Sequence, residues 1–232
     1  MRIVIIQMCD GKSIYKNILD VTSKSFIKYC DKYVYNYYRW DGIKNGNQPW
    51  KAIYNRPYIL KEFIEKEEDI DWLCLFDTDV YINCTEDWIS KYIKQFSDKA
   101  LIAHRIRPDP LGDWCISSSG LIFNLNNNLS KEWINSWQVL CENTIKTNYS
   151  DVLSDLLTIN GEDMLEEHII GDNHLLHQVI IPTNWSANLG YFSYGEGLFH
   201  IDRSTGVRFN KTLEERFEIM KIEVDKIINS EN

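Results

Sequence analysis

The stretch Leu73-Cys-Leu-Phe-Asp77-Thr-Asp79-Val-Tyr-Ile82 decides the fold, because the apolar run 72–76 ends directly in two carboxylates. A short apolar run followed by polar residues predicts a buried strand. Residues i and i+2 of a strand share one face, so Asp77 and Asp79 can address a single cation where the strand ends. Because burying an unpaired carboxylate is costly, a positive partner is expected there.

A plainer interpretation has Asp77 capping a turn and Asp79 exposed to solvent. An isolated Asp-x-Asp pair is weak evidence for a metal site. Its position at the end of the run 72–76 nevertheless favours a metal site. In open α/β sheets, ligands gather at this carboxyl end of the strands.

Apolar runs alternate with amphipathic segments along the chain. Strands are expected at residues 2–8, 72–76, 100–103 and 120–125, β-forming residues occupy 33–38, and another short apolar run occupies 179–181. Helices are expected at residues 14–29, from Pro57, from a cap at Ser130, and near 162–178. This alternation predicts an α/β fold with a mostly parallel central sheet flanked by helices on both faces.

The end of the chain predicts an amphipathic helix. Thr212-Leu-Glu-Glu215 is a capping box. Apolar residues follow at three- and four-residue steps, at Leu213, Phe217, Met220, Val224 and Ile227. We expect this helix to pack against the domain, because its two to three heptads are short for a coiled coil.

Length and composition indicate one domain and exclude several classes of function. The chain has 232 residues, a net charge of −9 and 44% hydrophobic residues. An acidic chain does not suit recognition of nucleic acid through its phosphates. No run approaches the roughly 18 apolar residues of a membrane span. The start of the chain does not read as a signal peptide, and the six scattered cysteines suit a reducing compartment, so a cytoplasmic protein is expected.

Three further features can complete a site for an anionic ligand. Lys51 and Arg56 lie upstream of the acidic pair and can supply positive charge. The small-residue turn at 117–120 permits a close approach to a ligand. His200 follows a glycine-rich stretch, with Arg203 and Arg208 behind it.

In their order and type, these motifs resemble the GT-A glycosyltransferases. The likeness is greatest to the galactosyl-, mannosyl- and xylosyltransferases of fungi and plants and to the bacterial lipooligosaccharide galactosyltransferases. It covers residues 1–210. The resemblance implies a single Rossmann-like GT-A domain over 1–232, with a nucleotide-binding half at 1–125, an acceptor-binding and metal-closing half at 126–210 and a C-terminal helix at 211–232.

The same resemblance implies transfer of a hexose from a UDP-sugar to a carbohydrate or glycoconjugate acceptor, with retention of configuration. Asp79 and His200 would bind a metal ion, and Asp77 would be either a third ligand or a partner of the ribose. Two carboxylates and an imidazole suit Mn²⁺, with Mg²⁺ as the alternative.

The resemblance also assigns the remaining site residues. Asp172 and Asn173 would be the catalytic pair, and Asp113 and Trp114 would line the sugar pocket. Donor contacts would come from Gln7, Met8, Cys9, Asp10, Lys51, Arg56, Asp77, Thr78, Ser118, Ser119 and Gly120, and from Arg203 or Arg208 in place of a diphosphate-binding lysine. The chain departs from the family at Ser118, which stands for an asparagine, and at Asn173, which stands for a glutamine.

Two other functions remain open at this point. A phosphatase of the haloacid-dehalogenase type also has an apolar strand that runs into Asp-x-Asp, but its nucleophilic strand usually opens the chain. A non-catalytic module that binds nucleotide sugars would fit the departures at Ser118 and Asn173.

Overall fold

A computed structural model describes residues 1–46, 49–66, 69–105, 116–147, 172–183, 185–195, 197–201 and 212–230. The central sheet has the strand order β2-β1-β3-β6-β5-β7. Its strands are β1 (Ile3–Cys9), β2 (Asn36–Asp41), β3 (Trp72–Phe76), β5 (Leu101–Arg105), β6 (Ile116–Asn124) and β7 (Leu189–Phe192).

The sheet is mostly parallel, as the sequence predicts. β1 pairs in parallel with both β2 and β3, and β5 pairs in parallel with β7. β6 is antiparallel to its neighbours β3 and β5. A separate antiparallel pair joins β4 (Val80–Ile82) to β8 (Leu198–His200).

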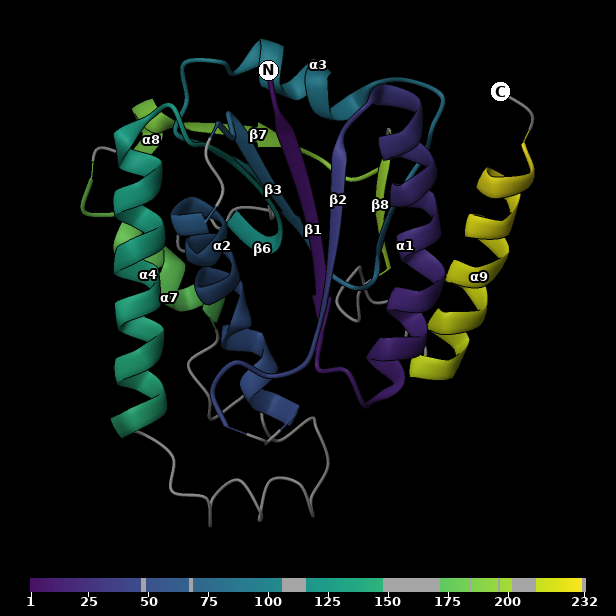
Figure 1. The fold of residues 1–232 in the computed structure, drawn as a ribbon, viewed down its shortest axis with the longest axis horizontal. Helices are drawn as coiled ribbons and strands as arrows, with labels where there is room; N and C mark the ends of the chain where they lie inside the picture. Colours follow the sequence, from purple (N-terminus) through teal and green to yellow (C-terminus); the bar gives the residue numbers. More distant parts are fainter. Residues whose placement is uncertain are drawn as a thin grey trace, which may run out of the picture.

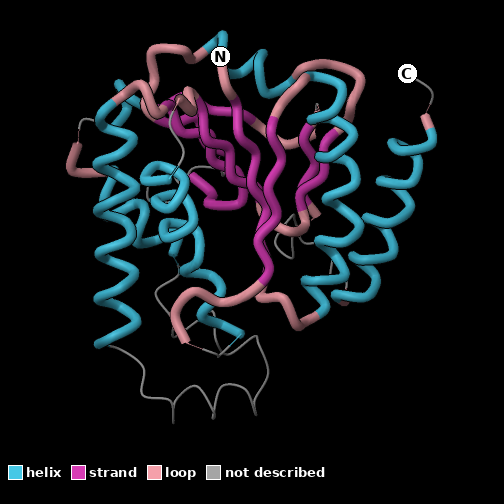
Figure 2. The backbone as a smooth tube through the Cα atoms, viewed as in Figure 1, coloured by secondary structure: helices cyan, strands magenta, loops and turns pink. Residues whose placement is uncertain are grey.

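Helices cover both faces of the sheet, so the molecule has three layers (Figures 1 and 2). They are α1 (Ile14–Tyr33), the 3₁₀ helix η1 (Pro49–Tyr54), α2 (Asn55–Lys66), α3 (Trp88–Gln95), α4 (Asn128–Thr147), α7 (Asp172–Ile180), the short α8 (Trp185–Asn188) and α9 (Leu213–Asn229). In Figure 1, α1 and α9 lie together on one side, and α2, α4 and α7 lie on the other.

The alternation of strand side chains explains this layering. Val4 and Ile6 of β1 belong to the apolar cluster that includes residues of α2, α4 and α7. Ile3 and Ile5 belong to the cluster that includes residues of α1 and α3. Successive strand residues point to opposite faces, so a fully apolar strand such as β1 or β3 has to be covered on both sides.

Several element boundaries differ from the sequence prediction. The helix expected at 14–29 continues to Tyr33, where Val34 adopts a left-handed conformation and its N–H bonds the carbonyl of Cys30. The strand expected at 33–38 therefore starts at Asn36. The prediction that Ser130 caps a helix was wrong, since α4 begins at Asn128 and the Ser130 hydroxyl donates to the carbonyl of Ala100 at 2.6 Å.

Other differences lie in the second half of the chain. The strand expected at 120–125 begins four residues earlier, at Ile116, and the run 179–181 is not a strand, because α7 continues to Ile180. The first part of the helix expected near 162–178 lies outside the described residues. The three short strands β4, β7 and β8 were missed.

The C-terminal helix packs against the domain as predicted. The Thr212 capping box is present, with both of its hydrogen bonds formed. Met220 and Val224 of α9 are fully buried in a cluster with Ile18 and Val21 of α1. The Lys28 ammonium of α1 donates to the carbonyls at the end of α9. α9 is therefore joined to α1 along its length.

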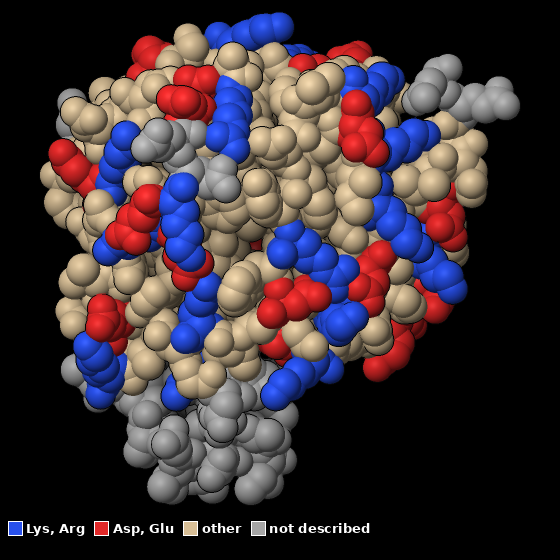
Figure 3. Space-filling view, viewed as in Figure 1, with Lys and Arg blue, Asp and Glu red and all other residues tan. Residues whose placement is uncertain are grey.

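Three global features can be described for the part of the chain that the structure covers. The cysteines at 9, 30, 74, 84 and 141 are buried and free of disulfides. Among the described helices, none is both long enough and apolar enough to cross a bilayer. Acidic and basic side chains are interspersed over the face shown in Figure 3.

The packing of α9 predicts unequal costs for two truncations on the same helix. Met220→Ala should lower the free energy of unfolding by about 2–5 kcal/mol, because it leaves a cavity against α1. Ile222→Ala should change it by less than about 0.5 kcal/mol, because Ile222 is 53% exposed. Urea denaturation measures both. Equal costs would contradict the docking of α9 on α1.

Candidate functional site

The turn between β3 and β4 carries the two acidic residues. The N–H of Asp77 donates to the carbonyl of Ser119 at 2.9 Å, and the N–H of Val80 donates to the carbonyl of Asp77 at 3.2 Å. The carbonyl of Thr78 accepts a hydrogen bond from the Thr22 hydroxyl of α1 at 2.6 Å. The backbone of the Asp-x-Asp turn is thus fixed by both β6 and α1.

Gln7 of β1 also supports this turn. Its amide nitrogen donates to the carbonyls of Asp77 (2.9 Å) and Val80 (3.1 Å), and its amide oxygen accepts from the Tyr37 hydroxyl (3.0 Å). Gln7 is 0% exposed, so its side chain has no exposed atom to offer a ligand. The structure therefore places Gln7 beneath the acidic turn, and the donor contact expected for it stays a prediction.

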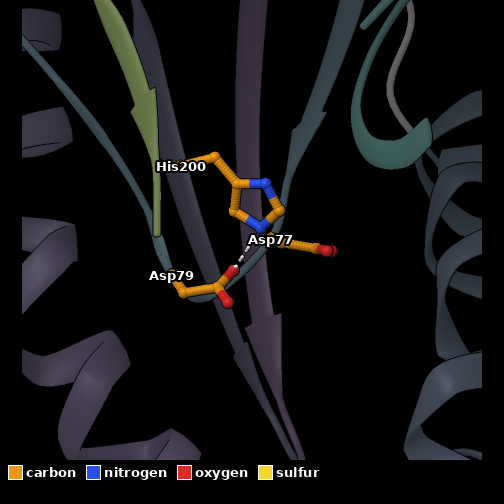
Figure 4. Close-up of side chains that lie close together, drawn as sticks. All are labelled: Asp77, Asp79 and His200. Atoms are coloured by element: carbon orange, nitrogen blue, oxygen red, sulfur yellow. Dashed lines mark ion pairs between the residues drawn. The ribbon is translucent and has the colours of Figure 1, made fainter. Parts of the chain in front are cut away.

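Asp77, Asp79 and His200 form a candidate metal site. One ligand atom from each residue lies within 4.8 Å of the other two. His200 Nε2 is 3.1 Å from Asp79 Oδ1. Figure 4 shows the imidazole of His200 and the carboxylate of Asp79 facing each other, while the carboxylate of Asp77 points to the side. The pairing of Val80 with His200 across β4 and β8 brings the late histidine to the acidic turn.

Arg216 of α9 contacts the same carboxylate and was missed in the sequence. Its guanidinium forms an ion pair with Asp79 Oδ2, and its Nε donates to the carbonyl of Ile201 at 2.8 Å. Arg216 is only 2% exposed. A signal existed, because Arg216 lies within the apolar stripe between Leu213 and Met220, where a charged residue needs a buried partner.

These partners determine the charge of Asp79, which is 8% exposed and therefore not the solvated residue of the plainer interpretation. Burial alone would raise the pKa of its carboxyl group. His200 and Arg216 outweigh that effect and hold the pKa of Asp79 below its usual range. Asp79 is consequently an anion although it is buried, which a cation ligand requires.

Arg56 joins the acidic turn to the start of α7. Its guanidinium pairs with Asp77 Oδ1 through Nη2 and with Asp172 Oδ2 through Nη1, the latter at 2.6 Å. Burial is the main cause that raises the pKa of Asp172, and neighbouring Asp77 adds to it, while Arg56 opposes both. In this structure Arg56 pairs with two carboxylates, and the diphosphate contact expected for it stays a prediction.

The small-residue strand segment meets the same end of α7. The Ser118 N–H donates to Asn173 Oδ1 at 2.9 Å, so the two positions that depart from the resembled family lie in direct contact. Ser119 Oγ lies 3.2 Å from the Tyr194 hydroxyl. A Cβ atom at Gly120 would lie 2.6 Å from that hydroxyl. In this structure the side chain that approaches Gly120 closely is therefore Tyr194, whereas a ligand was expected there from the sequence.

The remaining expected residues lie in two places. Met8, Cys9 and Asp10 stand at the end of β1, where the Asp10 carboxylate accepts from the N–H groups of Lys12 and Ser13, both at 3.1 Å. Lys51 lies in η1, directly before α2. Arg203, Arg208, Asp113 and Trp114 lie outside the described residues.

Neither the known family models nor the curated proteins contain a match to this sequence. Solved structures do. A glycosyltransferase involved in glycosylation of the major capsid of PBCV-1 has a TM-score of 0.61 at 12% identity, covering 96% of this chain and 100% of its own. The galactosyltransferase LgtC, solved with donor and acceptor sugar analogs, has a TM-score of 0.51 at 10% sequence identity, covering 95% of each chain.

The glycosyltransferase GlyE of Streptococcus pneumoniae TIGR4 has a TM-score of 0.52 at 15% identity, over 99% of this chain and 63% of its own. The chain has the GT-A fold. At these identities, the comparisons establish the fold. The GT-A sheet places Asp77 and Asp79 at the carboxyl end of β3, and the β4–β8 pair brings His200 to them.

The shared ion pairs of Arg56 predict a strong effect on stability. Arg56→Met should lower the free energy of unfolding by about 3–5 kcal/mol, because two carboxylates in the site lose their cation. Adding Asp172→Asn should recover part of the loss. Arg39→Met is the matched control and should cost less than about 1 kcal/mol, because its partners Asp20 and Asp41 are well exposed. If urea denaturation gave the same loss for both arginines, the bridge would not be a structural element.

Proposed function

We propose that this protein is a metal-dependent glycosyltransferase that moves a hexose from a UDP-sugar to a carbohydrate or glycoconjugate acceptor. The proposal is supported mainly by one observation: Asp77, Asp79 and His200 lie close together at the carboxyl end of β3 in a GT-A sheet. The solved complex of LgtC with donor and acceptor sugar analogs supports sugar partners of this kind.

The residues of the site fit a divalent cation. Asp79 and His200 would hold the ion, with Asp77 as a third ligand or as a partner of the ribose. Two carboxylates and an imidazole suit Mn²⁺, and Mg²⁺ is the alternative. When bound, the ion supplies Lewis-acid neutralisation of the charge that develops on the diphosphate leaving group.

The protein's own residues would bind and orient the donor. We assign the nucleotide to residues 1–125, with Met8, Cys9 and Asp10 at the end of β1 and Thr78 in the acidic turn. The acceptor would meet residues 126–210, and the helix at 211–232 completes the single domain. We propose Lys51, Arg56 and either Arg203 or Arg208 as the cations for the diphosphate, with Arg56 also paired with two carboxylates of the site.

Asp172 and Asn173 are the proposed catalytic pair. Arg56 fixes the carboxylate of Asp172, and Ser118 fixes the amide of Asn173, so both side chains have defined orientations at the start of α7. An amide is too weak a nucleophile to form a glycosyl intermediate. We therefore propose that the pair supports an oxocarbenium-like transition state, with retention of configuration, and that Ser118, Ser119 and Gly120 lie beside the sugar.

The fold disfavours the phosphatase alternative, whereas the binding-module alternative is decided by experiment. The phosphatase interpretation rested on an apolar strand before Asp-x-Asp, and that strand is now placed in a GT-A sheet. The non-catalytic interpretation rested on Ser118 and Asn173, which are joined by a hydrogen bond from the Ser118 N–H to Asn173 Oδ1, and a turnover measurement decides it. Cleavage of an aryl phosphate would support the phosphatase, and donor binding without turnover would support the binding module.

A thermal-shift panel tests the metal-dependent function. UDP-glucose, UDP-galactose and GDP-mannose are compared with and without Mn²⁺, and a donor at about 100 times its Kd should add about 2.7 kcal/mol of stability. Asp79→Asn should abolish the metal-dependent part of this shift, measured against the variant's own baseline. Asp98→Asn is the control and should leave it intact, because the Asp98 side chain is 72% exposed. A full shift in Asp79→Asn would place the ion elsewhere.

The stereochemical proposal has a direct measurement. Slow hydrolysis of an α-linked UDP-hexose in the presence of Mn²⁺ should release the α-hexose first, as followed by proton NMR before mutarotation. Initial release of the β-hexose would identify an inverting enzyme and would remove the role assigned to Asn173.

A further inference from the structure

Arg216 is the charged group next to the candidate metal site that the proposed function leaves unused. We propose that Arg216 is a positioning residue that preorganises the cation site by holding Asp79 and the end of β8 in one arrangement. This inference rests on the metal dependence proposed above. It assigns to the C-terminal helix a part in metal binding.

The contacts of Arg216 connect both segments that carry the candidate ligands. The guanidinium pairs with Oδ2 of Asp79, which precedes β4, and donates from Nε to the carbonyl of Ile201, which follows His200. The N–H of Ile201 in turn donates to the carbonyl of Asp79 at 3.3 Å. One side chain therefore closes the end of the two-stranded sheet at which Asp79 and His200 meet.

The two oxygens of Asp79 have different partners. Arg216 occupies Oδ2, whereas Oδ1 faces His200 Nε2 at 3.1 Å. A cation between Asp79 and His200 would use Oδ1 and would leave the arginine pair in place. By fixing Oδ2, Arg216 prevents rotation of the carboxylate and keeps Oδ1 directed toward the imidazole.

The chemistry of arginine suits this role. Its planar group carries several donors in a fixed fork, so it can bind a carboxylate and a carbonyl at once, whereas lysine provides a single flexible charge. Groups that orient metal ligands typically change metal affinity by about 10–100-fold when they are removed.

Helix α9 holds the arginine rigidly. The Arg216 N–H bonds the carbonyl of Thr212 at 3.0 Å, within the first turn that the capping box stabilises. One turn later, Met220 is fully buried against α1. Arg216 itself is 2% exposed, so its position is set by the packing of the helix.

The opposite role would be competition, in which the positive charge of Arg216 repels the metal ion. The two roles predict opposite signs. Loss of a positioning group weakens metal binding, whereas loss of a competing charge strengthens it. The matched control is Lys221→Gln, which removes one positive charge from an exposed position of the same helix.

Isothermal titration of the full chain with MnCl₂ tests the proposal without any activity measurement. Arg216→Gln should weaken Mn²⁺ binding by about 10–100-fold. Arg216→Lys, which keeps the charge and loses the fork, should also weaken it, and Lys221→Gln should change it by less than about twofold. Circular dichroism identifies any variant that does not fold. If Arg216→Gln does not fold, the Mn²⁺ affinity of Arg216→Lys decides the question.

Each outcome has a separate meaning. Wild-type affinity or tighter binding in a folded Arg216 variant would overturn the positioning role, while the metal site would stand if Asp79→Asn still lost binding. No Mn²⁺ binding by the wild-type chain would overturn the proposed metal dependence, and this inference with it.

Discussion

The site is organised by the need to neutralise three carboxylates that the fold gathers near the end of one buried strand. Asp77 and Asp79 leave β3, and Asp172 begins α7 beside them. Arg56 pairs with Asp77 and Asp172, while Arg216 and His200 pair with Asp79. Because buried charges are tolerated only when they are paired, these partners determine which carboxylate oxygens stay available to a metal ion.

These pairs also connect distant parts of the chain. Arg56 joins α2 to α7 at the end of β3, and Arg216 joins α9 to the β4–β8 pair. Gln7 fixes the backbone of the acidic turn from below. The candidate metal ligands are therefore held by side chains from both faces of the sheet, which reduces the reorganisation needed when a ligand binds.

The features that could be predicted are those encoded by short stretches of sequence, such as apolar runs and capping motifs. The apolar run 72–76 and its two carboxylates indicated β3 and the site, and the capping box at Thr212 indicated α9. Pattern could not show β8, because its three residues gain strand geometry only by pairing with β4. Nor could it show that Gln7 supports the backbone of the acidic turn or that Asp79 is the partner of Arg216, because these contacts join residues far apart in the sequence.

We propose that Asp79 and His200 bind the cation that assists departure of the nucleotide diphosphate. The most direct measurement is the anomalous difference map of crystals that contain Mn²⁺ and UDP. We expect a manganese peak between Asp79 and His200, with the diphosphate beside it. Bound UDP with no manganese peak at these residues would contradict it.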